Sequence, residues 1–541
     1  MFRARVLLCL LVVLQSSLAG GFQLQLYNSL SSPPTPAPHR TVTGTVVNGL
    51  TGAPIRRALV QLQGVKQSSA LTGSDGRFEF EDVPEGVTNI FAQKPGFFNS
   101  ESLSGSEWTA PPVFKVGPSK NDFQVILTPA ARIVGHITDK AGEPINGATI
   151  QILSDQLTQG RRQWQNRYGG GTDDDGSFRI DDLAPGRYIL FTGGHSQPLG
   201  DWLGPYIVSR PAYYPDANDL ASAQPIELRA GQEFRADLHL ATEQGHKLNI
   251  TVNGMPAGAG LGFQFQNSNG QDIHVGGLQF DQSRGQISSQ AVPSGRWTLV
   301  VSANENLGHT YVARQEITVN HTDIPDLQIS LHPAAHLPVT INRAVKAGQE
   351  ADPTPQSMGL FARLISVDSV TSAQYVAATQ SDPPILQFAN VPAGKYRLDV
   401  PSNGLGCMES AWYGNVDLTH NYLEIGADGD ATQPVVINLG DCATLKAQVR
   451  LNSKSASAFL VIVPNNAMGE PMIGHIGQQT SQSSVSISIA PGTYQVYAVS
   501  SLAGLEYANP EVMRDYPSQT VTLQAGQSSS VTLELTERKG N

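Results

Sequence analysis

The stretch Phe178-Arg179-Ile180-Asp181-Asp182-Leu183-Ala184-Pro185-Gly186-Arg187-Tyr188-Ile189-Leu190-Phe191 decides the fold of this 541-residue chain. Its first part alternates apolar and polar side chains, a pattern typical of a β-strand with one buried face. Pro185 and Gly186 then favour a tight turn that reverses the chain. A second strand-like segment begins at Tyr188. The stretch therefore predicts two antiparallel strands joined by a turn.

The same turn returns five times along the chain, usually with an aromatic residue after the glycine. Successive turn prolines are 101, 108, 99 and 99 residues apart. A repeat of this length has the size of a whole domain and not of a solenoid repeat. We therefore expect about five domains in series. The five copies are Val83-Pro84-Glu85-Gly86, Ala184-Pro185-Gly186-Arg187-Tyr188, Val292-Pro293-Ser294-Gly295-Arg296-Trp297, Val391-Pro392-Ala393-Gly394-Lys395-Tyr396 and Ala490-Pro491-Gly492-Thr493-Tyr494.

The first two repeats share further motifs. Val42-Thr-Gly44-Thr-Val46 corresponds to Ile133-Val-Gly135-His-Ile137, and Asp75-Gly76-Arg77-Phe78 corresponds to Asp175-Gly176-Ser177-Phe178. Asp-Gly between two alternating segments is a hairpin signal. No segment combines a helical period with a capping box. The pattern predicts an all-β chain with two packed sheets in each repeat.

This series of motifs resembles the carboxypeptidase regulatory-like domain, a small transthyretin-like β-sandwich. The resemblance implies a tandem array of about five transthyretin-like or immunoglobulin-like antiparallel β-sandwich domains, rod-like or loosely bent. The resemblance also implies a secreted bacterial protein. In this family the domain is an accessory to a catalytic or membrane domain, so the resemblance indicates the fold better than the function. The resemblance is closer in the first two domains than in the last three. The expected domains are unit one (40–129), unit two (130–242, with a loop insertion), unit three (243–333), unit four (334–440) and unit five (441–538).

The N-terminus predicts export. Arg3 and Arg5 precede an apolar run, and Ser17-Leu18-Ala19 offers a small-residue cleavage pattern, so residues 1–19 read as a signal peptide. The alternative is an uncleaved anchor, but the run is shorter than the about 20 residues that span a bilayer. Residues 20–39 read as a Pro-rich leader. We expect a secreted, periplasmic or cell-surface protein with no integral membrane segment after cleavage.

The net charge and the absence of catalytic motifs limit the ligands and reactions that the chain is expected to support. A net charge of −11 argues against nucleic acid as a partner, because phosphate binding needs a basic surface. No histidine pair has zinc-peptidase spacing, no P-loop is present, and Gly194-His195-Ser196-Gln197-Pro198 lacks the last glycine of a nucleophile elbow. We predict no catalytic residue, cofactor or metal. Asp173-Asp174-Asp175 offers carboxylates for Ca²⁺, but a turn in which aspartates bond backbone amides is favoured.

Unit two carries an insertion, residues 161–171, where unit one has a short loop. Exposed aromatics and arginines on a scaffolded loop can stack on a sugar or a peptide. The alternative is that these rings are packing residues of a larger domain. The candidate ligand-binding residues are Trp164, Arg167 and Tyr168 in the insertion, and Trp202, Tyr213 and Tyr214 in a second aromatic stretch.

Cys407 and Cys442 are the two cysteines that remain after signal cleavage. An oxidising compartment favours a disulfide between them, and two separate buried thiols are the alternative. The resulting hypothesis is a non-catalytic exported scaffold or binding protein, with a glycan or an envelope protein as its partner. The rival hypothesis is an accessory component of a secreted hydrolase, or a carboxypeptidase-like hydrolase with a dispersed site.

Overall fold

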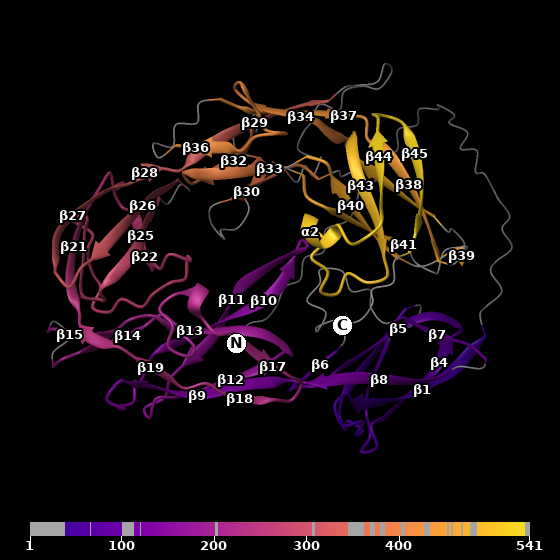
Figure 1. Cartoon of the computed structure of the whole chain (residues 1–541), viewed down its shortest axis with the longest axis horizontal. Helices are drawn as coiled ribbons and strands as arrows, with labels where there is room; N and C mark the ends of the chain where they lie inside the picture. The colour runs from indigo at the N-terminus through magenta and orange to yellow at the C-terminus, as the bar shows by residue number, and fades with distance from the viewer. Residues whose placement is uncertain are drawn as a thin grey trace, which may run out of the picture.

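A computed structural model shows the chain as a series of β-domains (Figure 1). The predicted signal peptide and almost all of the predicted leader lie outside the residues that it describes. The described residues are 38–64, 67–99, 113–118, 121–200, 204–305, 309–343, 362–367, 374–378, 385–401, 406–426, 433–451, 454–455, 458–466, 469–476 and 484–535.

Units one and two each contain two facing sheets, and unit two adds a small third sheet. The sheet orders are β4-β1-β8-β6 and β3-β2-β5-β7 in unit one, and β12-β9-β18, β11-β10-β13-β16 and β14-β15-β20 in unit two. The elements of unit one are β1 (His39–Asn48), β2 (Leu59–Gln63), β3 (Ser68–Leu71), β4 (Arg77–Pro84), β5 (Gly86–Gln93), β6 (Phe97–Phe98), β7 (Val113–Val116) and β8 (Asp122–Pro129). Those of unit two are β9 (Ala131–Asp139), β10 (Thr149–Thr158), β11 (Arg161–Gly171), β12 (Ser177–Leu183), β13 (Gly186–Thr192), β14 (His195–Pro198), β15 (Tyr206–Ser209), β16 (Ala212–Tyr213), η1 (Leu220–Ser222), β17 (Ile226–Leu228), β18 (Glu233–Arg235), β19 (Leu238–Leu240) and β20 (Thr242–Gln244).

Units three and five repeat this plan, whereas the strands of unit four form one continuous sheet. Unit three has the sheets β23-β24-β21-β27 and β22-β25-β26-β28, unit four has one nine-stranded path, and unit five has β39-β38-β42, with β45 beside β38, and β41-β40-β43-β44. The elements of unit three are β21 (His246–Asn253), β22 (Gly260–Gln266), β23 (Gln279–Asp281), β24 (Gln286–Val292), β25 (Gly295–Asn304), β26 (Thr310–Val319), β27 (Ile324–Ser330) and β28 (His332–Pro333). Those of unit four are β29 (Ala335–Arg343), β30 (Arg363–Ser366), β31 (Gln374–Ala378), β32 (Leu386–Val391), β33 (Gly394–Asp399), β34 (Cys407–Tyr413), β35 (Val416–Asp417), β36 (Leu423–Ile425) and β37 (Val435–Gly440). Those of unit five are β38 (Ala443–Leu451), β39 (Lys454–Ser455), β40 (Ala458–Pro464), β41 (Met472–Ile476), β42 (Ser484–Ile489), β43 (Gly492–Val499), α2 (Pro510–Met513), β44 (Ser518–Leu523) and β45 (Ser528–Glu534).

The all-β prediction is confirmed. Within the described residues, helical structure is limited to η1 and α2. Each unit has its own buried apolar cluster, and each cluster contains a fully buried side chain at its centre. These central side chains are Ile90, Ile150, Leu299, Phe388 and Leu460, one for each unit in chain order. The exact domain boundaries stay a prediction.

The repeated turn does not make the hairpin that its sequence predicts. It joins β4 to β5, β12 to β13, β24 to β25 and β42 to β43, and in each case the two strands belong to different sheets. The Asp-Gly turns after β3 and β11 also lead from one sheet to the other. Alternation identifies strands but carries no information on which strand is the partner. The turn is therefore a corner of the sandwich, and the prediction of two paired strands was wrong.

The first and last long strands of each unit run parallel. The pairs are β1 with β8, β9 with β18 and β19, β21 with β27, β29 with β37, and β38 with β45. The close approach of these strands explains the shared glycine of the first two units. A Cβ on Gly135 would lie 1.8 Å from the Ala236 carbonyl oxygen, and one on Gly44 would lie 2.4 Å from that of Phe123.

The array is neither rod-like nor loosely bent. In Figure 1 the chain curves through units three and four until α2 of unit five lies beside the β10–β11 end of unit two. The Ala508 amide of unit five donates a hydrogen bond to the Gly160 carbonyl of unit two at 3.1 Å. The units from two to five therefore form a closed circuit.

Candidate functional site

The unit-two insertion is a long hairpin rather than a loop. β10 and β11 pair from Thr149 with Gly171 up to Thr158 with Arg161. Gln159 and Gly160 make the two-residue turn, with φ angles of 49° and 73°. Positive φ at both positions is the geometry of a type I′ turn, whose twist matches that of paired strands. The hairpin extends sheet β11-β10-β13-β16 beyond the sandwich.

The aromatic residues predicted to bind a ligand lie in different environments. Trp164 packs against a small buried cluster that includes Phe191 and Tyr213. Tyr213 is only 1% exposed, and its hydroxyl bonds the Gln271 side chain of unit three at 2.7 Å. Tyr214 packs edge-on against Phe234, with ring centroids 6.0 Å apart. The ring of Tyr213 is thus enclosed by the protein itself, and the two other rings have packing contacts.

The remaining predicted residues are less constrained. Arg167 is exposed on β11, and Tyr168 pairs with Gln151 through its backbone. Trp202 lies outside the described residues. The structure therefore does not gather the six candidates into one surface. A ligand-binding role for them stays a prediction.

The triple-aspartate segment forms the turn that the sequence favours. The Asp175 carboxylate accepts the Ser177 amide at 2.9 Å, and Asp174 accepts the Asn146 side chain at 2.8 Å. The pKa of Asp175 is lowered, chiefly by its hydrogen bonds to Ser177. In unit one, Asp75 accepts the Arg77 amide in the same way. Asp75 and Asp175 thus accept backbone amides, as expected for a turn, and Asp174 instead accepts a side-chain amide.

A polar network joins units two and three at the repeated turn of unit three. Ser294, the middle residue of that turn, donates its amide to one Glu243 oxygen at 2.7 Å and its hydroxyl to the other at 3.0 Å. Arg210 binds both oxygens of Glu243, at 3.2 and 2.9 Å. The nearest ring nitrogens of His246 and His321 lie 3.1 and 2.9 Å from the Ser294 hydroxyl. Burial raises the pKa of Glu243, but Arg210 and Ser294 outweigh burial, and the pKa is lowered overall.

The residue types of this network suggest a hydrolase triad or a metal site. In a triad, histidine bridges serine and the acid through its two different ring nitrogens. Here Glu243 bonds Ser294 directly and approaches the same His321 nitrogen, Nδ1, at 3.6 Å. The ligand atoms of Glu243, His246 and His321 lie within 4.8 Å of one another, as a metal would need. However, Arg210 occupies both Glu243 oxygens and the Ser294 hydroxyl lies among the three side chains. We interpret the network as a joint between domains.

Two histidine pairs lie at neighbouring joints. The rings of His195 in unit two and His274 in unit three are stacked with centroids 6.5 Å apart. Burial lowers the pKa of both side chains. His309 and His336 lie 5.1 Å apart between units three and four, and burial together with His309 lowers the pKa of His336. Burial therefore favours the neutral imidazole at His195, His274 and His336.

A shallow groove of about 430 Å³ lies on the sheet β23-β24-β21-β27 of unit three. Its lining is mostly polar, with amides, hydroxyls and carboxylates from four strands. Such side chains offer donors and acceptors suited to a hydroxyl-rich ligand. The corresponding sequence signal is the alternation of polar and apolar residues along β21 and β24. Alternation indicates that one face of a strand is exposed to solvent, but it does not indicate a groove on that face. The polar lining includes Asn249, Thr251, Gln279, Gln286, Ser288 and Asp326.

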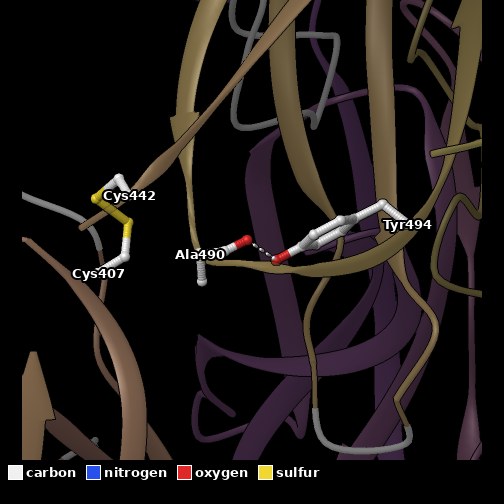
Figure 2. The surroundings of a disulfide bond; sticks show 4 residues. All are labelled: Cys407, Cys442, Ala490 and Tyr494. Atoms are coloured by element: carbon white, nitrogen blue, oxygen red, sulfur yellow. Dashed lines mark hydrogen bonds between the residues drawn. A yellow bond between two sulfur atoms is a disulfide. The ribbon is translucent and has the colours of Figure 1, made fainter. Parts of the chain in front are cut away.

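The predicted disulfide between Cys407 and Cys442 is confirmed (Figure 2). Cys407 begins β34 at the edge of unit four, and Cys442 directly precedes β38 of unit five. The Cα atoms are 5.0 Å apart. The bond therefore fixes the start of unit five to the sheet of unit four.

Comparison with known proteins supports the fold of unit one. The sequence profile described as the carboxypeptidase regulatory-like domain matches residues 41–107. Residues 41–107 are thus similar to this domain family. The match includes most of β1 and all of β2 to β6, and it does not extend into unit two. No curated protein matches the chain.

Solved structures align only at low TM-scores, from which no functional conclusion follows. The Bacillus anthracis TIE protein aligns with 54% of this chain and 51% of its own, at 14% identity and a TM-score of 0.17. The minor pilin GBS52 of Streptococcus agalactiae aligns with 38% of this chain and 96% of its own, at 14% identity and 0.21. The major pilin subunit BcpA of Bacillus cereus aligns with 75% and 99%, at 9% identity and 0.15. In the part of the chain that the structure describes, no helix is long and apolar enough to cross a membrane.

Proposed function

We propose that this protein is an exported, non-catalytic scaffold that binds a glycan or an envelope protein. The observation that carries the proposal is the way in which successive units are fixed to one another. A disulfide joins units four and five, and the hydrogen-bonded network of Arg210, Glu243 and Ser294 joins units two and three. Rigid joints suit a protein that holds binding surfaces at set positions. The disulfide also supports export, because such bonds persist in oxidising compartments.

Two surfaces are candidates for the binding role. The groove on unit three presents Asn249 and Ser288, whose polar groups suit the hydroxyls of a sugar. The unit-two hairpin presents Arg167, which is exposed. Trp164 is a poorer probe than Arg167, because its contact with the buried cluster of unit two couples binding to folding.

The experiment applies the purified mature protein to glycan and cell-wall arrays, and separately to peptide and glycoside hydrolysis panels. We expect retention on one class of glycan or wall material and no turnover. Retention should fall at least tenfold in Asn249→Ala/Ser288→Ala or in Arg167→Ala, and not in Asn342→Ala on unit four. Turnover that survives repurification would favour the hydrolase hypothesis. Absence of retention on both arrays would remove the proposed binding role.

A further inference from the structure

The end of the unit-two hairpin contacts a segment that is enlarged in unit five. Residues 500–517 connect β43 to β44 and include α2, whereas the corresponding connection between β25 and β26 of unit three is only residues 305–309. The longer segment has an apolar cluster of its own, in which Leu502, Tyr507 and Met513 are buried. Unit five therefore holds this segment in a defined shape in front of the hairpin.

The contact at the hairpin tip leaves no room for a side chain. The Ala508 amide donates to the Gly160 carbonyl at 3.1 Å. A Cβ on Gly160 would lie 2.4 Å from the ring of Tyr507 and 2.7 Å from the Ala508 nitrogen. Gly160 is itself buried, although it lies at the far end of a projecting hairpin. The backbone turn of unit two thus packs directly against the Tyr507 ring of unit five.

A charged pair supports the same contact. Arg162 donates from Nε to Glu506 of unit five at 2.9 Å and from Nη1 to Asp155 of its own hairpin at 3.1 Å. Asp155, whose side chain is only 6% exposed, also lies 3.3 Å from Arg187. Burial lowers the pKa of Arg162, but Asp155 and Glu506 outweigh burial and raise the pKa overall, so Arg162 is charged. The bond to Asp155 therefore holds the Arg162 guanidinium in the orientation in which it contacts Glu506 of unit five.

We propose that the β10–β11 hairpin is an intramolecular clasp, in which Gly160 and Arg162 bind the 500–517 segment of unit five and close the chain into a ring. The binding partner of the hairpin tip is thus another domain of the same molecule. The three contacts come from segments more than 300 residues apart, and each uses a different chemistry. Because both halves belong to one chain, their effective concentration favours the closed form over contacts between molecules. This inference does not depend on what the scaffold binds.

Hydrogen exchange at the Ala508 amide tests the clasp in the full-length mature protein. Glu506→Arg places a second cation opposite Arg162 and leaves the hairpin unchanged. We expect exchange at Ala508 to accelerate at least tenfold in this variant, with β40 and β43 still protected. Glu511→Arg makes the same charge change on α2, where Glu511 approaches Arg514 and not unit two, and should leave Ala508 protected.

A second pair of variants tests the other side of the contact. Arg162→Ala should accelerate exchange at Ala508, whereas Arg167→Ala on the same hairpin should not. Light scattering with size-exclusion chromatography accompanies each measurement and should show a monomer. The proposal is overturned if Ala508 of the wild type exchanges as fast as an open loop, or if Glu506→Arg and Glu511→Arg behave alike. It is also overturned if protection disappears on dilution, because the contact would then join two molecules.

Discussion

The aromatic side chain two residues after the turn glycine fastens the repeated turn in units two to five. The hydroxyls of Tyr188, Tyr396 and Tyr494 donate to the carbonyl four residues earlier, at 2.6, 2.9 and 2.7 Å. Trp297 does the same through Nε1 at 2.9 Å. Each ring thus closes the turn that it follows, and Figure 2 shows the contact between Tyr494 and Ala490.

Replacing Tyr494 by Phe should lower the free energy of unfolding of unit five by about 1 kcal/mol, the net value of one such hydrogen bond. Tyr497→Phe is the control, since its hydroxyl bonds the Gln495 side chain of its own strand and not a turn carbonyl, and we expect a smaller loss than for Tyr494→Phe. Denaturant unfolding measures both variants. Equal losses would contradict the corner role of Tyr494.

The same tyrosine predicts a response to high pH. Burial raises the pKa of Tyr494 to about 12 from its ordinary value of 10.0. The folded state therefore favours the neutral phenol, and this contribution to stability is lost as pH rises from about 10 to about 12. Burial also raises the pKa of Tyr188 and Tyr213, so ultraviolet titration should show several late-ionising tyrosines, and their number should fall by one in Tyr494→Phe. If every tyrosine of the wild type ionised near pH 10, the burial of the Tyr494 hydroxyl would be contradicted.

Gly135 tests the close approach of the first and last strands. Gly135→Ala should destabilise unit two by about 3 kcal/mol or more, because the backbone at Ala236 must move. Gly171→Ala in the same unit is the control, since its added Cβ would have its nearest contact at 3.7 Å and should cost less than about 1 kcal/mol. Thermal unfolding compares the two. A tolerated Gly135→Ala would mean that this strand pairing is wrong.

The strands and turns show which features of the fold can be predicted from the sequence and which cannot. Strand segments follow from alternation, and the recurrent proline–glycine turn marks the same strand connection in each unit. Alternation does not reveal that β4 and β5 belong to different sheets, because the pattern records which face is buried and not which strand is adjacent. The pairing of Cys407 with Cys442 follows from their number and the expected compartment. Burial of Tyr213 does not follow from sequence, because its partner Gln271 belongs to another unit.

The disulfide should stabilise the junction of units four and five. Cys407 and Cys442 are 35 residues apart, and a loop of that length is worth about 3–4 kcal/mol in the loop-entropy description. Cys407→Ser/Cys442→Ser should lower the stability of unit four by that amount and leave unit one unchanged. Hydrogen exchange resolved by unit measures both effects. Unchanged protection of β34 and β37 would contradict this role.

The joint between units two and three should weaken in mild acid. Burial lowers the pKa of His195 and His274 below the ordinary value of 6.5. The neutral forms are therefore favoured in the folded protein, and their stabilisation is lost as pH falls below about 6.5. The protection factors of the β14 amides, which correct for slower intrinsic exchange at lower pH, should fall between pH 7.5 and 5.5. His195→Gln/His274→Gln should remove that pH dependence, and its persistence would locate the titrating groups elsewhere.

The shape of the whole molecule depends on contacts that no local pattern reports. Arg162 and Glu506 are 344 positions apart, and neither residue belongs to a repeated motif. The sequence could therefore predict a series of β-domains but not the curvature that brings unit five back to unit two (Figure 1). Four joined units and the hairpin contact together convert a linear series into a ring.

Small-angle X-ray scattering of the mature monomer tests this ring most directly. Five domains in an extended row would have a radius of gyration of roughly 50 Å, given about 13 Å for each domain. The ring predicts a value below about 40 Å that does not change with protein concentration. A value near 50 Å, or one that falls only when the protein associates, would contradict the closed arrangement.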